Sequence, residues 1–204
     1  MTLLETQYFP AIAWCAALWP EKSVALDAAE HYQKGGLRNR CYLIGPNGIQ
    51  RLSIPLEKGK HQKTPIRDVR ISNSEPWQRQ HWRSIQAAYG NAPFYAHYES
   101  ALRPFVEKKW PFLYDLNLEI IDFVLNKTFR WSGEIHPETS YTPPGEWPKG
   151  LDGRNQVLEI EAAPYAQVFE DRHGFVPNLS VLDLLFCTGK LGGEVLARTK
   201  IIPN

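Results

Sequence analysis

Residues 2–28 read TLLETQYFPAIAWCAALWPEKSVALDA, and this stretch decides the fold class. Thr2–Phe9 is predicted to begin as a short strand. Ala11–Leu18 follows a proline directly, is rich in alanine, and predicts a short buried helix. Ser23–Ala28 is a brief apolar run with the length of a buried strand. A strand, a helix and a second strand in this order are the beginning of an α/β unit.

The next segment predicts a β-hairpin. Residues 41–56 read CYLIGPNGIQRLSIPL, in which two apolar runs flank a turn that contains Asn47-Gly48. Asn-Gly is a strongly preferred pair in tight hairpin turns because both residues tolerate a positive φ. Ile66–Ser72 alternates in polarity and is predicted to form an edge strand.

From Trp77 onward the periodicity becomes helical. Helices are predicted over Trp77–Tyr89, Pro93–Val106, Pro111–Leu125 and Ser180–Phe186. Residues 132–154 are rich in proline and glycine and predict a long loop. We therefore expect a single domain over residues 1–204, of α/β (or α+β) class. Its N-terminal mixed sheet carries the hairpin, and its second half is mostly helical.

Composition narrows the function classes. The 204 residues include 23 Lys and Arg and 22 Asp and Glu, a balance that disfavours nucleic-acid binding through bulk charge. No run of 18 apolar residues predicts a membrane span, and Glu5 lies where a signal peptide would be apolar. We therefore expect a cytoplasmic protein. Three cysteines without C-x-x-C spacing and six histidines without H-x-x-x-H predict no metal site, and no motif indicates a cofactor.

The loop Tyr32–Arg40 is the most suggestive segment chemically. It combines a tyrosine, a lysine and two arginines with Gly35-Gly36, which would let the backbone approach a ligand closely. The alternative is a solvated basic loop. Residues 7–10 lie at the predicted strand-to-helix junction, where free helix N–H groups attract anions. If the two segments lie side by side they would form one anion site. The alternative for the junction is a packed aromatic turn.

One histidine and two cysteines are candidates for catalysis. His173 lies beside Glu170 and Asp171, whose charges could raise its pKa and suit it to general acid–base work. Cys15 lies in an apolar helix, where an inert buried thiol is the default. Cys187 precedes Thr-Gly-Lys, but the upstream glycine of a phosphate-binding loop is missing.

Four blocks of sequence together resemble the WbqC-like protein family. They are QYFPAIAW (7–14), HYQKGGLRNRCYLIGPNGIQRLSIPL (31–56), WQRQHWRSIQAAYGNAPFYAHY (77–98) and YAQVFEDRHGFVPNLSVLDLLF (165–186). The R-N-R of residues 38–40 and the P-N-L-S of residues 177–180 match the family pattern. Cys15 takes a position that is more often aromatic in the family, which argues against a cysteine nucleophile.

The resemblance implies a role in bacterial surface-polysaccharide biosynthesis, because the family is associated with O-antigen gene clusters. It suggests a transferase-type enzyme that binds an anionic donor, either a nucleotide sugar or an acyl or aminoacyl carrier. On this hypothesis His173 would move a proton, the basic loop would hold phosphates, and Gln7 and Tyr8 would orient the substrate. The candidate substrate-binding residues are Gln7, Tyr8, Tyr32, Lys34, Arg38, Asn39, Arg40 and Asn178.

Two alternatives remain open. One is a non-catalytic binding or assembly protein that uses an aromatic surface, for which Trp131 and Trp147 would be suited. The other is a nucleotidylyltransferase-like enzyme with a nucleotide over the first helix, although the H-x-G-H signature of those enzymes is missing. An enzyme should bring the basic loop and Gln7 together around a concave pocket. An assembly protein should expose a broad aromatic patch and leave the cations of the loop splayed apart.

Overall fold

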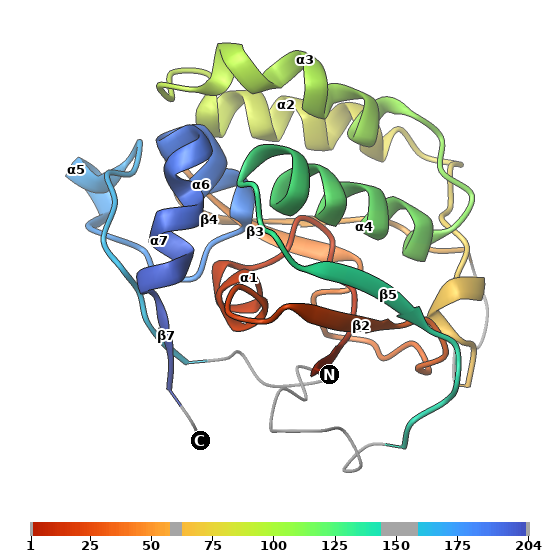
Figure 1. Ribbon diagram of the computed structural model, residues 1–204. Helices are drawn as coiled ribbons and strands as arrows, with labels where there is room; N and C mark the ends of the chain where they lie inside the picture. Colours follow the sequence, from red (N-terminus) through yellow and green to blue (C-terminus); the bar gives the residue numbers. More distant parts are fainter. Residues whose placement is uncertain (1, 58–62, 144–158, 203–204) are drawn as a thin grey trace.

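The opening segment folds as a parallel β–α–β unit (Figure 1). The computed structural model describes residues 2–57, 63–143 and 159–202. β1 (Thr2–Leu4) pairs in parallel with β2 (Ser23–Asp27), and α1 (Ile12–Leu18) connects them. β1 is shorter than predicted, because the chain after Leu4 turns into a buried loop in which Phe9 has a φ of 41°. Every residue of α1 is buried, so this short helix lies inside the molecule.

A third strand joins the sheet from a segment that was predicted to be a loop. β5 (Glu134–Glu138) pairs in parallel with β2, which gives the strand order β1-β2-β5. The prediction of a loop over residues 132–154 is therefore wrong in its first part. β5 is an edge strand, and an edge tolerates Pro137 because proline has no N–H to donate to a ladder. Residues 144–154 of that prediction lie outside the described residues.

The hairpin is confirmed, and it forms a separate two-stranded sheet. β3 (Arg40–Gly45) and β4 (Gly48–Ser53) pair in antiparallel fashion, and Gly48 has a φ of +103° beside the turn. The edge strand predicted over Ile66–Ser72 is wrong. A 3₁₀ turn, η1 (Ile66–Asp68), begins that segment, and only isolated bridges follow it. Its apolar residues are buried by the neighbouring loops and helices, so their spacing does not indicate a ladder.

The predicted helices are confirmed with small shifts of their ends. They are α2 (Trp77–Tyr89), α3 (Tyr95–Glu107), α4 (Leu113–Asp122), which continues into the π-helical turn η2 (Phe123–Thr128), and α6 (Val181–Thr188). The remaining elements are α5 (Glu170–His173), η3 (Gly189–Leu191), α7 (Gly192–Arg198), and the strand pair β6 (Ile160–Glu161) and β7 (Lys200–Ile201).

Helices cover the parallel sheet and share a buried core with it. Figure 1 shows α4 above β2 and β5, α2 and α3 beyond α4, and α6 and α7 beside α1. A continuous cluster of buried apolar side chains joins α1, the hairpin and all four longer helices. The α/β class is thus confirmed. Within the described ranges, no helix combines the length and the apolar character that a bilayer crossing requires.

Candidate functional site

The basic loop and the strand-to-helix junction lie side by side. The backbone N–H of Tyr8 donates to the carbonyl of Leu37 at 3.2 Å. The amide of Asn117 donates both to the hydroxyl of Thr6 and to the carbonyl of Arg38, at 3.2 and 2.8 Å. Both segments follow the carboxyl ends of parallel strands, which is where open α/β sheets bind their ligands.

Arg38 is buried in an ion pair and does not face solvent. Its guanidinium binds Glu30 in bidentate fashion, with Nε donating to Oε1 at 2.8 Å and Nη2 donating to Oε2. Both side chains are fully buried. Burial raises the pKa of Glu30 to about 7, and the neighbouring carboxylates of Glu5 and Asp27 add to the rise while Arg38 opposes it. Three carboxylates thus lie close together at the carboxyl end of these strands, and two of them, Glu30 and Glu5, act on Arg38.

The remaining nitrogen of Arg38 lies against the glycine pair. Within the described residues, Nη1 of Arg38 is buried without a hydrogen-bond partner. A Cβ atom on Gly36 would lie 2.8 Å from it, so a side chain at residue 36 would displace the guanidinium. Elsewhere in the loop, the hydroxyl of Tyr32 donates to Asn39 at 3.2 Å, and the amide of Asn39 donates to the carbonyl of Ile54 at 2.8 Å.

The cations of the loop do not converge on one pocket. Arg38 points into the core, Lys34 is exposed, and Arg40 is half-buried. Arg40 lines a small cavity together with Asn178. Tyr32 lies near both arginines, whose charges oppose the rise in its pKa that burial causes.

The two polar side chains at the junction, Gln7 and Tyr8, are hydrogen-bonded to other groups of the protein. The amide of Gln7 donates to Glu5 at 2.9 Å, and its oxygen accepts from the N–H of Ala11 at 3.1 Å. The hydroxyl of Tyr8 lies 3.1 Å from Nδ1 of His81. Burial lowers the pKa of His81 to about 4 and raises the pKa of Tyr8 well above its ordinary value. Both rings are therefore neutral at pH 7.

The N-terminus of α1 is capped by other parts of the chain. Oδ1 of Asn178 accepts from the N–H of Ala13 at 2.9 Å, and the carbonyl of Leu179 accepts from the N–H of Ile12 at 3.0 Å. With Gln7 bound to Ala11, these amides are not available to a phosphate. Asn178 has a φ of 57°, a conformation that asparagine tolerates better than most residues.

His173 lies away from the basic loop. Its Nε2 lies 3.2 Å from the carbonyl of Gly45, at the far end of β3 from Arg40. Five residue steps along a strand separate these ends, roughly 17 Å. Figure 1 likewise shows α5 on one side of the molecule and the arrowheads of β2 and β5 on the other.

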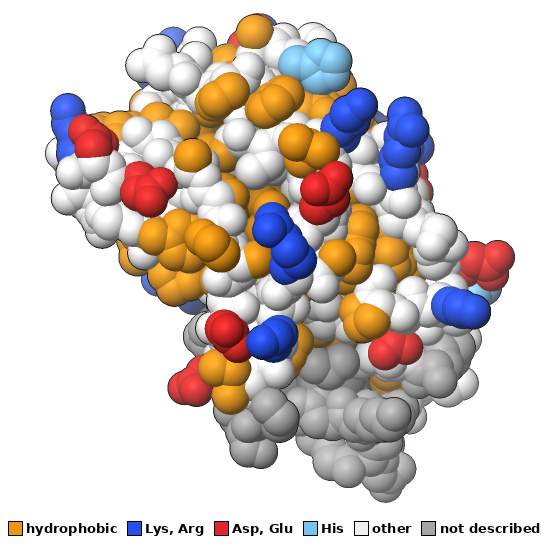
Figure 2. Space-filling model, turned by 60° about the vertical axis from the view of Figure 1, so that its left-hand side comes forward, with side chains coloured by type: hydrophobic (Ala, Val, Ile, Leu, Met, Phe, Trp, Pro, Cys, Tyr) orange, Lys and Arg blue, Asp and Glu red, His pale blue; other side chains and the backbone are white. Residues whose placement is uncertain are grey.

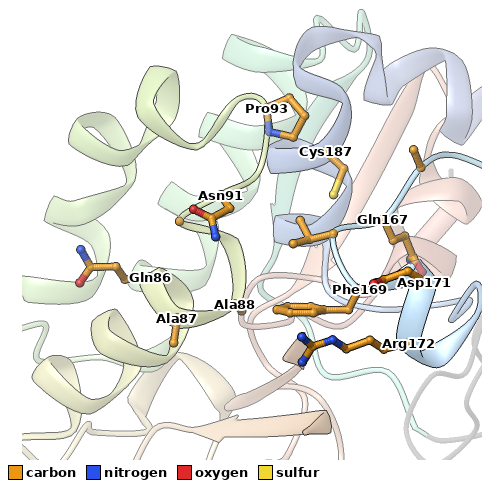
Figure 3. A pocket seen from close by; sticks show the side chains of 13 residues that line it. Gln86, Ala87, Ala88, Asn91, Pro93, Gln167, Phe169, Asp171, Arg172 and Cys187 are labelled. Carbon is orange, nitrogen blue, oxygen red and sulfur yellow. The ribbon is translucent and has the colours of Figure 1, made fainter. Parts of the chain in front are cut away.

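A cleft of about 530 Å³ opens near α5 (Figure 3). One wall is the C-terminal end of α2 and the turn into α3, and the other is the segment 166–172 with Cys187 of α6. The sequence does not predict this cleft, because its polar residues match no spacing motif. The side chains with polar atoms along its lining are Gln86, Asn91, Gln167, Asp171 and Arg172.

The thiols are poorly suited to nucleophilic catalysis. Burial raises the pKa of Cys187 to about 12, and the charge of Asp183 adds to the rise. Burial also raises the pKa of Cys15 and of Cys41. In residues 2–57, 63–143 and 159–202, no three His, Cys, Asp or Glu side chains are arranged to hold a metal ion.

The family model of the WbqC-like protein family matches residues 6–146, well over half of the chain. The chain belongs to the WbqC-like protein family. The matched region contains Glu30, Arg38 and the hairpin, whereas His173 and one wall of the cleft lie beyond it. Comparisons of this WbqC-like chain with curated proteins and with solved structures gave no match.

Proposed function

We propose that this chain is a transferase-type enzyme of bacterial surface-polysaccharide biosynthesis that binds an anionic donor at the loop Tyr32–Arg40. Membership of the WbqC-like family supports the proposal, and its biological context is the association with O-antigen gene clusters that the resemblance implies. The main observation that supports a functional site at this loop is the buried Glu30–Arg38 pair. It lies with two further carboxylates at the carboxyl end of parallel strands. Strongly perturbed titratable groups concentrate at functional sites.

The buried ion pair is better evidence of a functional role than of a contribution to the stability of the protein. Removing two charges from water costs several kcal/mol per ion, so a buried pair contributes little net stability. In this chain the pair fixes the position of the loop, because Arg38 joins it to the turn after β2. Arg38 is thus a positioning residue. The cations left to bind the phosphate or carboxylate of a donor are Lys34, which is exposed, and Arg40, which is half-buried.

His173 has no role in this proposal, since it contacts the distant end of the hairpin. Tyr8 would act by joining the junction to the loop through its backbone N–H, which donates to Leu37. Gln7 and Asn39 would hold the two segments in place through Glu5 and the carbonyl of Ile54. Tyr32 lies beside both arginines, at the border of the loop with the core.

The two criteria for an assembly protein receive different support from the described residues. The cations of the loop are splayed, as that alternative expects, but the exposed aromatic surface that it also requires is not supported. Trp131 is buried, with its Nε1 donating to the carbonyl of Trp19, and Trp147 lies outside the described residues. Figure 2 shows apolar side chains interspersed with basic and acidic ones, without one uninterrupted patch on that face. A nucleotide over α1 would have to displace the groups that cap its first amides.

A thermal-shift titration of the intact chain tests the proposal. The probes are UDP, UDP-glucose, 4′-phosphopantetheine and a neutral oligosaccharide. A ligand at 100 times its Kd adds about 2.7 kcal/mol to the free energy of unfolding. We expect one phosphorylated class to stabilise the protein and the Lys34→Ala, Arg40→Ala double variant to lose the effect. Lys109→Ala, an exposed lysine elsewhere, should retain it.

Transfer itself is then measured by mass spectrometry, as movement of the donor group to a glycan acceptor. If no anion stabilises a well-folded protein, or if the double variant binds as the wild type does, the donor site at this loop is wrong. Binding without transfer to any acceptor would favour the assembly protein.

A further inference from the structure

We propose that the cleft of Figure 3 binds a sugar that carries one acidic group, either a carboxylate or a phosphate. This site lies away from the loop Tyr32–Arg40 and does not depend on the transferase proposal. Its volume of about 530 Å³ falls within the range of small-molecule sites, roughly 300–1,000 Å³.

Both walls of the cleft are fixed on the same helix. The turn between α2 and α3 is joined to α6 by the N–H of Phe94, which donates to the carbonyl of Phe186 at 3.0 Å. The ring of Phe186 also lies 5.2 Å from the rings of Tyr89 and Tyr95, centroid to centroid. These contacts join this wall of the cleft to α6.

The opposite wall rests on a buried carboxylate of α6. Asp183 accepts hydrogen bonds from the hydroxyl of Tyr165 at 2.6 Å and from the amide of Gln167 at 2.9 Å. Gln167 also binds the backbone of Val176 on both sides of its amide, with distances of 2.9 and 2.8 Å. These bonds hold the segment 166–169 in place, so the cleft is formed before a ligand arrives, which reduces the entropy cost of binding.

The polar groups at the opening remain available for a ligand. Gln86 and Asn91 are exposed on one wall, and Asp171 and Arg172 are exposed on the other. Within the described part of the chain, none of these four side chains makes a hydrogen bond or ion pair. Figure 3 shows Phe169 and Arg172 extending from their wall toward α2.

This combination of groups selects the ligand class. The amides of Gln86 and Asn91 can both donate to and accept from hydroxyl groups, and the carboxylate of Asp171 can accept from them. The face of Phe169 suits the apolar C–H face of a sugar ring. The guanidinium of Arg172 can bind a carboxylate or phosphate with two parallel hydrogen bonds. Asp171 beside it would repel a ligand with several negative charges, which favours one acidic group over a nucleotide diphosphate. The neutral thiol of Cys187 adds packing without thiolate chemistry.

An NMR titration of the intact chain tests this site. The probes are glucuronate, glucose 6-phosphate, glucose, inorganic phosphate and acetate. We expect glucuronate, glucose 6-phosphate or both to bind at least tenfold more tightly than glucose or the free anions. The first two probes distinguish a carboxylate from a phosphate. Arg172→Ala should raise the Kd of the acidic sugar at least tenfold, and Asn91→Ala severalfold.

Arg67→Ala is the matched control, an exposed arginine on η1 whose loss should leave the Kd unchanged. Because Arg172 is exposed, its variant should keep the melting temperature of the wild type, which separates lost binding from lost folding. Equal binding of phosphate and glucose 6-phosphate would overturn the sugar assignment. Failure of both acidic sugars to bind, or wild-type affinity in Arg172→Ala, would overturn the site.

Discussion

At the scale of single residues, Glu30 makes the stability of the protein depend on pH. Its pKa rises from an ordinary value of 4.5 to about 7 in the folded protein, mainly because it is buried. Between these values the folded state holds a proton that the unfolded state has released. The free energy of unfolding contributed by this group is therefore fully present below pH 4.5 and is lost as the pH rises through 7.

Glu30→Gln should remove this dependence. Urea denaturation of both proteins between pH 4.5 and 8 should show the wild type losing stability relative to the variant as pH rises. The full difference approaches about 3 kcal/mol, at 1.36 kcal/mol per pKa unit. If the wild type instead gained stability relative to Glu30→Gln over this range, the ion pair with Arg38 would dominate over burial, and the raised pKa would be wrong.

Alanine substitutions at two glycines distinguish the destabilisation caused by backbone strain from that caused by steric overlap. Gly189 has a φ of +58°, and a Cβ on it would lie 2.7 Å from the ring of Phe94. Gly174 has a φ of +67°, but a Cβ there would meet nothing within 4 Å. We expect Gly174→Ala to cost about 1 kcal/mol from strain alone and Gly189→Ala to cost about 2–3 kcal/mol. Thermal denaturation measures both. Equal costs would show that Phe94 moves aside freely.

At the scale of elements, Asn178 joins the C-terminal segment to α1. Its Oδ1 accepts from the N–H of Ala13, so the side chain caps a helix 165 residues away in the sequence. Asn178→Ala should lower the free energy of unfolding by about 1–2 kcal/mol, as other lost caps do. Asn178→Asp keeps the acceptor oxygen and should retain most of the stability. Chemical denaturation distinguishes them, and equal losses in both variants would contradict the capping role.

The elements that the sequence predicts well are those with local causes. The hairpin follows from the chemistry of its turn, and α2, α3 and α4 follow from helical periodicity. β5 was missed because its partner β2 lies over 100 residues earlier, and Pro137 weakens the strand pattern. The sequence predicts Arg38 as a ligand-binding residue, but in the structure its guanidinium is buried against Glu30. Neither the burial nor the partner can be recognised from the sequence of a basic loop. The cleft depends on α6 bringing two distant segments together, which no spacing motif encodes.

At the scale of the whole molecule, α6 connects the parts of the chain. Val181 on α6 donates its N–H to the carbonyl of Pro10 before α1, and Ser180 donates its N–H to Tyr42 on β3. Phe186 contacts the aromatic residues at the ends of α2 and α3. Because one buried apolar cluster includes all of these elements, we propose that the described residues unfold as one cooperative domain.

Phe186→Ala tests that cooperativity. The side chain is fully buried, so its loss should cost about 3–5 kcal/mol through the cavity it leaves. Phe186→Leu fills most of the space and should cost less than half as much. In each variant, tryptophan fluorescence and far-ultraviolet circular dichroism should report the same urea midpoint, because both halves of the chain depend on this contact. Midpoints that separate by probe would show that the β–α–β unit and the helical half unfold independently, and the single-domain proposal would then be wrong.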